Sequence, residues 1–281
     1  MRKLTWILFL AFLLIATPVA ATTPFTSKPA LGASINWSHP LSRGLVAVFL
    51  MNEGGGTIVK NLASYQNGLL STHFFINNGI SCNGVSGYAD LKTNSRLNNL
   101  APLSYVALIN PINAGEGNLG CILTKTTASS SVPPKRFRLG YESATTSDLA
   151  LTMEAGATDL TVVAAGVIPH RKQSFVVATW DGINGAGVNL YVNGNKQSVS
   201  VTEPGGAIVD DSTHNYYAGA AGTSGAGTFN GFIYFIYIYS RALSPSEIQQ
   251  IYIEPYCFIE YKPWTMWGAT VAAARRIFMV H

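Results

Sequence analysis

The stretch from Gly231 to Tyr252 constrains the fold more than any other part of the chain. Its first part, Phe232 to Tyr239, is an unbroken run of aromatic and β-branched residues, which is typical of a largely buried strand. Ser244 follows, with proline directly after it and a glutamate three residues on, which predicts a capped helix start. Apolar residues then recur at helical spacing, and they are Ile248, Ile251 and Tyr252. We therefore predict a final core strand that is locked by a short helix.

Composition and turn signals place the rest of the chain in the all-β class. Only 11% of the residues are charged, whereas glycine occurs 27 times and tyrosine and phenylalanine 13 times each. A helical protein would carry more Glu, Lys, Ala and Leu. Short apolar strands alternate with turns, and the clearest hairpin covers residues 175–201, with Asn193-Gly194 at a turn. The sequence predicts an all-β sandwich.

The first residues carry the pattern of a secretory signal peptide, residues 1–21. Arg2 and Lys3 precede a largely apolar stretch, and small residues end at Ala21. The alternative is an uncleaved anchor, but the apolar stretch is shorter than the roughly 20 residues that span a membrane. Cleavage would lower the formal net charge from +4 to +2, since Arg2 and Lys3 leave, and +2 is too little to attract nucleic acid strongly. We expect a secreted or cell-surface protein without a membrane span, in which residues 22–35 form a linker or extended arm.

Three segments together resemble the concanavalin A-like lectin/glucanase superfamily, in its laminin G-like, or pentraxin-like, branch. They are residues 174–181 (SFVVATWD), 190–194 (LYVNG) and 231–252. Residues 37–45 and 51–56 resemble the opening of such domains in bacterial and phage-associated proteins. The resemblance covers residues 36–253 and implies a two-sheet antiparallel jelly-roll sandwich with one short C-terminal helix.

The same resemblance implies a non-catalytic module that binds carbohydrate or glycoconjugate. The first alternative is a structural or adhesive module of a phage particle or bacterial surface, with a protein partner. Glycoside hydrolases of this fold carry paired carboxylates as Glu-x-Asp-x-x-Glu on one strand, and this sequence has no such run. A hydrolase therefore stays an alternative only if two carboxyl groups from distant segments meet in a cleft. A Gly-x-Ser-x-Gly nucleophile turn is also missing.

Calcium is the metal to consider, because several members of the fold hold it, although no cofactor is required. Calcium needs several oxygen ligands, and the candidate donors are Asp181, Asp210 and Asp211. The loop that is often acidic in the family reads Asn83-Gly-Val-Ser-Gly-Tyr88 here, without carboxylates. The alternative role for Asp181 is to cap its own loop by hydrogen bonds to the backbone.

Aromatic side chains are the candidates for stacking on a sugar. Tyr237 and Tyr239 share one face of their strand, and Tyr216 and Tyr217 lie beside a histidine. These four tyrosines form a binding platform if their face is open, or fill the core if it is covered.

The C-terminal tail, residues 254–281, is apolar and follows the helix directly. We expect it to cover the unusually apolar strand 232–239; the alternatives are pairing with another chain or docking on a larger protein assembly. Three cysteines, Cys82, Cys121 and Cys257, allow at most one disulfide, and buried single thiols are expected.

Overall fold

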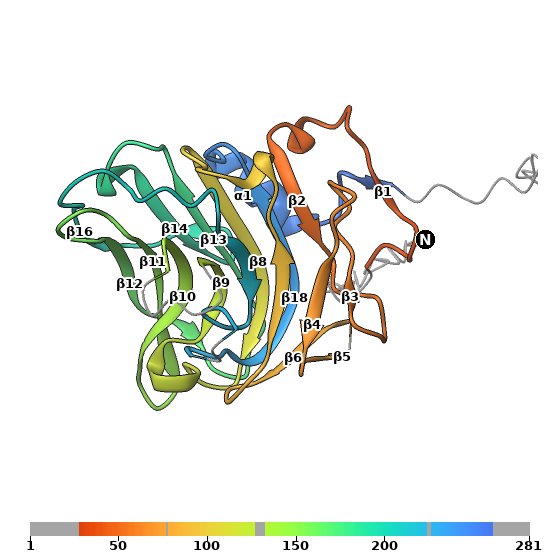
Figure 1. Cartoon of the computed structure of the whole chain (residues 1–281), viewed down its shortest axis with the longest axis horizontal. Coiled ribbons are helices and arrows are strands. Elements are labelled where there is room, and N and C mark those ends of the chain that lie inside the picture. The colour runs from red at the N-terminus through yellow and green to blue at the C-terminus, as the bar shows by residue number, and fades with distance from the viewer. Residues whose placement is uncertain (1–27, 77, 127–132, 224–225, 261–281) are drawn as a thin grey trace, which may run out of the picture.

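The computed structural model describes residues 28–76, 78–126, 133–223 and 226–260 (Figure 1). The predicted signal peptide and residues 261–281 of the tail lie outside this part. The described chain forms two large antiparallel sheets and one short α-helix, as predicted. None of its helices is long and apolar enough to cross a membrane.

The first sheet has nine strands, and the N-terminal strands β3 and β4 lie at one end of it (Figure 1). In spatial order they are β16 (Ser200–Thr202), β12 (Leu160–Pro169), β11 (Thr146–Met153), β10 (Lys135–Glu142), β9 (Cys121–Thr126), β17 (Asn215–Ala218), β7 (Tyr88–Lys92), β4 (Gly68–Ser71) and β3 (Ile58–Val59).

The second sheet has eight strands and contains the predicted core strand. In spatial order they are β15 (Asn195–Lys196), β14 (Val188–Val192), β13 (Ser174–Trp180), β8 (Leu103–Pro111), β18 (Asn230–Tyr239), β6 (Gly79–Asn83) and β5 (Phe74–Ile76), with β2 (Leu45–Phe49) paired to β18 beside this path. The connections contain single 3-10 turns at Pro40–Ser42, Ser95–Leu97, Glu116–Asn118 and Gly185–Gly187.

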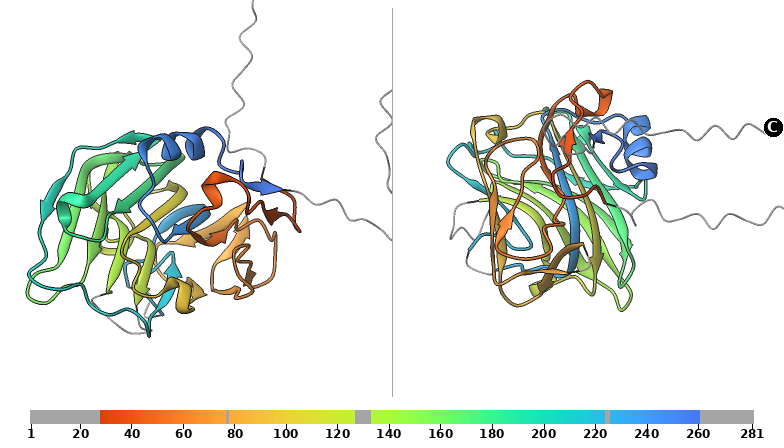
Figure 2. Two further views of the ribbon diagram at one scale, coloured as in Figure 1. Left: turned by 90° about the horizontal axis from the view of Figure 1, so that it is seen from above. Right: turned by 90° about the vertical axis from the view of Figure 1, so that its right-hand side faces the viewer.

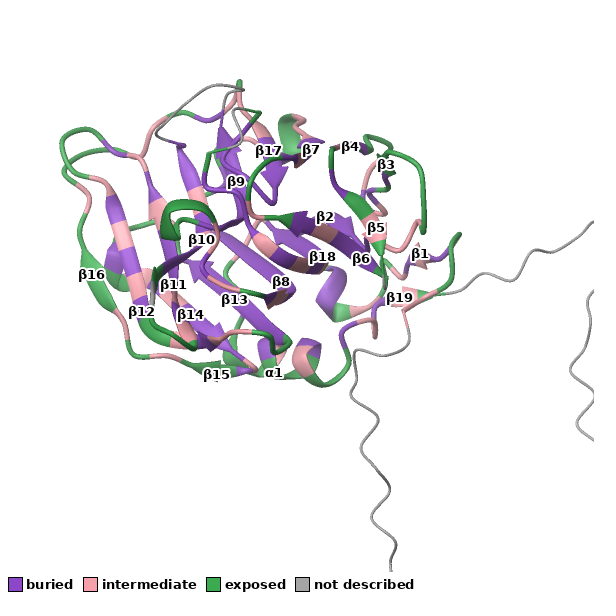
Figure 3. Ribbon diagram, turned by 90° about the horizontal axis from the view of Figure 1, so that it is seen from below, coloured by how far each residue is buried: buried purple, intermediate pink, exposed green. Residues whose placement is uncertain are grey.

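The apolar side chains form two cores, one between the sheets and one outside the second sheet. Buried residues accordingly make up most of the central strands (Figure 3). Strand β18 contributes to both cores because its residues alternate. Ile236 and Ile238 face the first sheet, whereas Phe235, Tyr237 and Tyr239 face outward and are covered. This second core is closed by helix α1 (Pro245–Ile253) and the residues after it, which lie outside the sandwich (Figure 2).

The helix begins as the sequence predicts. The Ser244 side chain accepts from the backbone N–H of Glu247, and the Glu247 carboxylate accepts from the backbone N–H of Ser244. This reciprocal pair satisfies two backbone donors at the helix start. Ile248 and Ile251 are buried against the outer face of the sheet.

The described part of the tail covers β18, which confirms that expectation for residues 254–260. Phe258 is fully buried with its ring 5.3 Å from that of Tyr237, and the Tyr237 hydroxyl donates to the carbonyl of Pro255 at 3.1 Å. Strand β19 (Ile259–Glu260) then pairs with β1 (Ser34–Ile35), so the tail and the N-terminal arm form a small two-stranded sheet.

Candidate functional site

Part of the outer face of the second sheet is left uncovered by α1 and the tail, and aromatic side chains gather there. The strand register places four residues in one row across β8, β18, β6 and β5: Asn110, Phe232, Ser81 and Phe74. The inward partners of this register, such as Ile109 and Ile80, belong to the core between the sheets, so the row faces outward. The Phe74 side chain is 73% exposed, and the others are partly exposed.

A bulge in β18 brings a second aromatic ring next to this row. The register of β18 against β8 shifts between Ile233 and Phe235, so Tyr234 is the extra residue. Its ring lies beside Gly79, where a Cβ atom would come within 3.0 Å of the ring carbon Cδ1. Gly79 pairs with Ile76 on β5, which is 47% exposed. The absence of a side chain at residue 79 therefore makes room for the tyrosine ring on the sheet surface.

We call Phe74, Ile76, Phe232 and Tyr234 the aromatic face. The rings of Phe232 and Tyr234 have centroids 6.3 Å apart and planes inclined by 22°, so they are nearly parallel. The polar side chains in the adjoining row, Asn110 and Ser81, are uncharged. Such a surface combines ring area with hydrogen-bonding groups and carries little charge.

One cation stands beside this face. Lys28 in the N-terminal arm donates from Nζ to the backbone carbonyls of Leu50, Asn78 and Tyr234. The same Nζ atom lies 5.9 Å from the centroid of the Tyr234 ring. The arm thus reaches the sheet at the position of the bulge.

The four candidate tyrosines are buried, so the structure gives the core alternative for them and not the platform. Tyr237 and Tyr239 lie under α1 and the tail, and Tyr216 lies between the sheets with its hydroxyl 3.0 Å from that of Tyr105. Tyr217 is 3% exposed and packs edge-on against Tyr88. Burial raises the pKa of the Tyr216, Tyr217, Tyr237 and Tyr239 hydroxyls, as expected for phenols kept from water. The aromatic face lies on the same strand β18, but at Phe232 and the bulged Tyr234.

Of the predicted metal donors, Asp211 has a structural role. It is fully buried, its Oδ1 is 2.8 Å from Lys125 Nζ, and its Oδ2 contacts Lys135 Nζ. Burial alone would raise the pKa of Asp211, but the charge of Lys135 and the hydrogen bonds from both lysines outweigh it and lower the pKa. Two ammonium groups therefore occupy the positions that a cation would need, so the expectation of a metal donor at this residue is corrected.

Asp181 and Asp210 are exposed, and their carboxylates accept hydrogen bonds from neighbouring backbone and side-chain groups. Asp181 accepts from the backbone N–H of Ile183 at 2.9 Å, which is the loop-capping alternative. Asp210 accepts from the side chain of Asn99 at 2.6 Å and from Ser212. Among the described residues, no group of three or more His, Cys, Asp or Glu side chains could hold a metal ion.

Several other carboxylates of the described chain are likewise engaged in structural contacts. Asp148 and Glu203 accept from backbone N–H groups of Gly166 and Gly185, and Glu247 is paired with Arg241 at 2.7 Å. A Ser–His contact exists between Ser147 Oγ and His170 Nε2 at 2.7 Å, but Ser147 is fully buried. A nucleophile in that position would not meet a substrate in this structure. All three cysteines are free, two buried and one partly buried, as expected.

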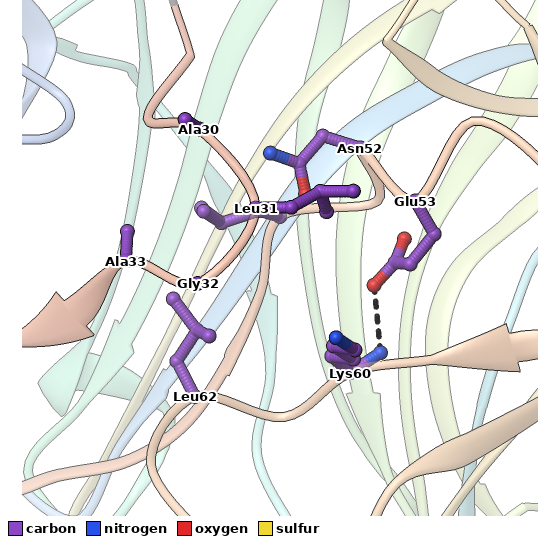
Figure 4. Close-up of a pocket in the computed structure, with 9 residues that line it drawn as sticks. Ala30, Leu31, Gly32, Ala33, Asn52, Glu53, Lys60 and Leu62 are labelled. Carbon is purple, nitrogen blue, oxygen red and sulfur yellow. Dashed lines mark hydrogen bonds between the residues drawn. The ribbon is translucent and has the colours of Figure 1, made fainter. Parts of the chain in front are cut away.

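The cavity drawn in Figure 4 is where the N-terminal arm packs against the loop after β2. Its volume is about 20 Å³, enough for about one water molecule, so it is a packing gap rather than a ligand site. Glu53 lies beside it and accepts from the backbone N–H of Lys60 at 2.7 Å (Figure 4). Larger hollows, of about 410 Å³ beside His170 and about 450 Å³ beside Ile58, are open to solvent and carry no ring cluster like that of the aromatic face.

A family model described as the concanavalin A-like lectin/glucanases superfamily matches residues 83–249. The chain belongs to this superfamily. No curated protein sequence matches the chain. The fold also resembles solved structures at low sequence identity, which speaks for the fold alone.

One similar structure is the Trypanosoma rangeli sialidase in complex with sialic acid, with a TM-score of 0.58 and 17% identity over 76% of this chain and 33% of the sialidase chain. This chain thus spans about a third of the length of that sialidase. Another is domain 4 of an extracellular GH43 arabinanase from Geobacillus stearothermophilus in complex with arabinotriose, with a TM-score of 0.51 and 14% identity over 74% of this chain and 97% of the domain.

Proposed function

We propose that this chain is a non-catalytic, secreted module that binds carbohydrate or glycoconjugate through the aromatic face. The observation that carries the proposal is the pair of nearly parallel, partly exposed rings of Phe232 and Tyr234 beside the 73%-exposed Phe74. Exposed apolar clusters of this kind mark interaction sites on soluble proteins. Superfamily membership, and the similar arabinanase domain in complex with arabinotriose, favour a sugar as the ligand.

The physical match lies in the two kinds of group that the face offers. A sugar ring presents C–H groups on its faces, which pack on aromatic rings, and hydroxyls at its rim, which need hydrogen-bond partners. Asn110 and Ser81 lie in the same row as Phe232 and supply such partners. The row crosses four strands, and at about 4.8 Å between strands it is about 14 Å long. That length suits a short oligosaccharide better than a single sugar.

The non-catalytic part of the proposal is supported by the engagement of the carboxylates. A glycoside hydrolase needs two carboxyl groups that face each other across the scissile bond. The adjacent pair Asp210 and Asp211 does not fit this need, because Asp211 is enclosed by two lysines. The extracellular location is supported by the signal-peptide pattern of residues 1–21.

The test is a glycan array with the purified protein, followed by affinity measurements on the best ligand. F74A and Y234A should each weaken binding, because each removes a ring from the face. Tyr141 on β10 of the first sheet is 75% exposed and provides a matched control, so Y141A should bind like the wild type. Lack of binding across broad polysaccharide classes, or equal losses in Y141A and F74A, would contradict the proposal. Release of reducing sugar by the wild type would instead show a hydrolase.

A protein partner is the second candidate, favoured by the position of β5. This strand is the last in its sheet and exposes Phe74 and Ile76, so a partner chain could pair with its free edge. Such a partner, as on a phage particle or bacterial surface, would depend on Phe74 and Ile76 but little on Tyr234, which is two strands inward. A ligand that is lost in F74A and kept in Y234A would therefore point to protein docking.

A further inference from the structure

We infer that Lys28 is a positioning residue for the aromatic face: it fixes the β18 bulge that presents Tyr234. The inference rests on the proposed function where it concerns binding, and on the contacts of Lys28 where it concerns the bulge. It extends the binding module into the N-terminal segment, which the sequence predicts as a linker or extended arm.

The three acceptors of Lys28 come from separate parts of the second sheet. Leu50 directly follows β2, Asn78 lies in the turn between β5 and β6, and Tyr234 is the bulged residue of β18. Two of these positions depart from regular strand geometry: Asn78 has a φ of 59°, and Tyr234 has no register partner on β8. Their carbonyls therefore need donors from outside the ladder.

Burial lowers the pKa of Lys28 to about 7, and below that pKa its ammonium group has three N–H donors and no acceptor, which suits this place. Lys28 directs them to three carbonyls at once, one on each segment that borders the bulge. A carbonyl left in this partly buried place without a donor would lose a hydrogen bond and its hydration together. The contact thus holds the end of β2, the β5–β6 turn and the bulge in one arrangement.

The consequence for the face follows from the alternation of a strand. A bulge that moves by one residue sends the flanking side chains to opposite faces of the sheet. Tyr234 would then leave the position beside Gly79 and no longer stand parallel to Phe232. Phe74 lies at the end of β5 remote from the Lys28 contact at Asn78, and it is held there by its pairing to Ser81.

The arm that carries Lys28 is itself anchored. The side chain of Asn52 donates to the carbonyl of Pro29 at 2.8 Å, and β1 pairs with β19 a few residues later. The segment that carries Lys28 thus has contacts to the domain that do not involve the Lys28 side chain. Substituting Lys28 therefore removes the hydrogen bonds of its amine and leaves these other contacts in place.

The test is a double-mutant cycle in glycan binding, in the full chain. If Lys28 acts through Tyr234, K28A should lower the association constant about tenfold in the wild type and less than about twofold in the Y234A background. In the F74A background the K28A loss should stay about tenfold, since the two act independently. K60A removes an exposed lysine near the same arm and should leave binding unchanged. An equal K28A loss in the Y234A and F74A backgrounds would overturn the inference.

A second measurement works on the free protein, whether or not a glycan is found. Hydrogen exchange should become faster in K28A at the amides of residues 233–236 and 78–80, while exchange in β13 stays as in the wild type. Unchanged exchange around the bulge would refute the positioning role, even if glycan binding had fallen. K28Q keeps two N–H donors, so it should lie between K28A and the wild type, and it replaces K28A if that variant does not fold. If the wild type binds no glycan but the exchange result holds, the proposed function fails and the role of Lys28 stands.

Discussion

The buried carboxylate of Asp211 is the most informative single position for stability, because two cations depend on it. Lys125 and Lys135 are register partners on β9 and β10, and both side chains turn toward the space between the sheets. Lys125 also lies 5.0 Å from the centroid of the Tyr216 ring and donates to the carbonyl of Leu97. Both Lys125 and Asp211 have fully buried side chains.

We predict that D211N destabilises the protein by about 3 to 5 kcal/mol, which is the usual cost of removing one partner from a buried ion pair. The asparagine keeps one acceptor oxygen but no charge, so two ammonium groups face each other at one end of the core. The loss is a large part of the roughly 5 to 15 kcal/mol that stabilises a domain. The neighbouring D210N is the control, because Asp210 is exposed and surface changes of this kind cost less than about 0.5 kcal/mol.

Urea unfolding followed by tryptophan fluorescence measures both variants, since Trp180 is buried in the core between the sheets. The midpoint should fall strongly for D211N and stay in place for D210N, with equal slopes. A D211N protein within about 1 kcal/mol of the wild type would show that the lysines do not depend on this carboxylate, and the argument from burial would fail. Because the folded-state pKa of Asp211 is lowered, its contribution is present above the ordinary aspartate pKa and is lost as the pH falls through the lowered value.

Other predictions concern pH and thiol reactivity. The hydrogen bond from Arg241 lowers the pKa of Glu247 from 4.5 to about 2. The free energy of unfolding should therefore fall by about 1 kcal/mol, a value reduced for screening by solvent, as the pH falls from 4.5 to 2. A pH series of urea midpoints should lack this decrease in E247Q. Burial lowers the pKa of His73 from 6.5 to about 4, so between these pH values the unfolded chain binds more protons than the folded protein. The free energy of unfolding should therefore fall by about 3 kcal/mol from pH 6.5 to pH 4. H73F should flatten that part of the profile, and an unchanged profile would contradict the assignment. In the native protein, thiol labelling followed by mass spectrometry should reach Cys257 first, because the other cysteines are buried; equal labelling of all three would contradict their burial.

The features that the sequence predicts well are local ones. The capping box at Ser244 and the strand of residues 232–239 depend on neighbours in the chain, and both are present. The tail also covers β18 as expected, because an apolar strand face needs an apolar cover and residues 254–260 are next in the chain. Local pattern and the nearest apolar partner were sufficient in these cases.

The features that the sequence does not reveal depend on partners that are distant in the chain. Nothing near Lys125 and Lys135 in the sequence indicates that they are buried, because their partner Asp211 is distant in the chain. The bulge at Tyr234 follows from pairing with β8, more than a hundred residues earlier, and strand propensity contains no sign of it. Alternation alone leaves open whether Tyr237 and Tyr239 form a platform or fill the core, and the cover over their face decides for the core.

The bulge in β18 separates a covered part of the strand's outer face from a partly exposed part. Beyond it, Phe235, Tyr237 and Tyr239 face outward and are sealed by α1 and the tail, so their rings contribute to stability. Phe232, before the bulge, and Tyr234, in it, continue the same aromatic series, and no described segment covers them completely, since both stay partly exposed. Tyr234 packs only partly against the outer core, so these two rings bury less area and add less to folding than their buried neighbours do. Their conspicuous place on the surface is best explained by a ligand that covers them, and Y234A should accordingly reduce binding far more than it reduces the free energy of unfolding.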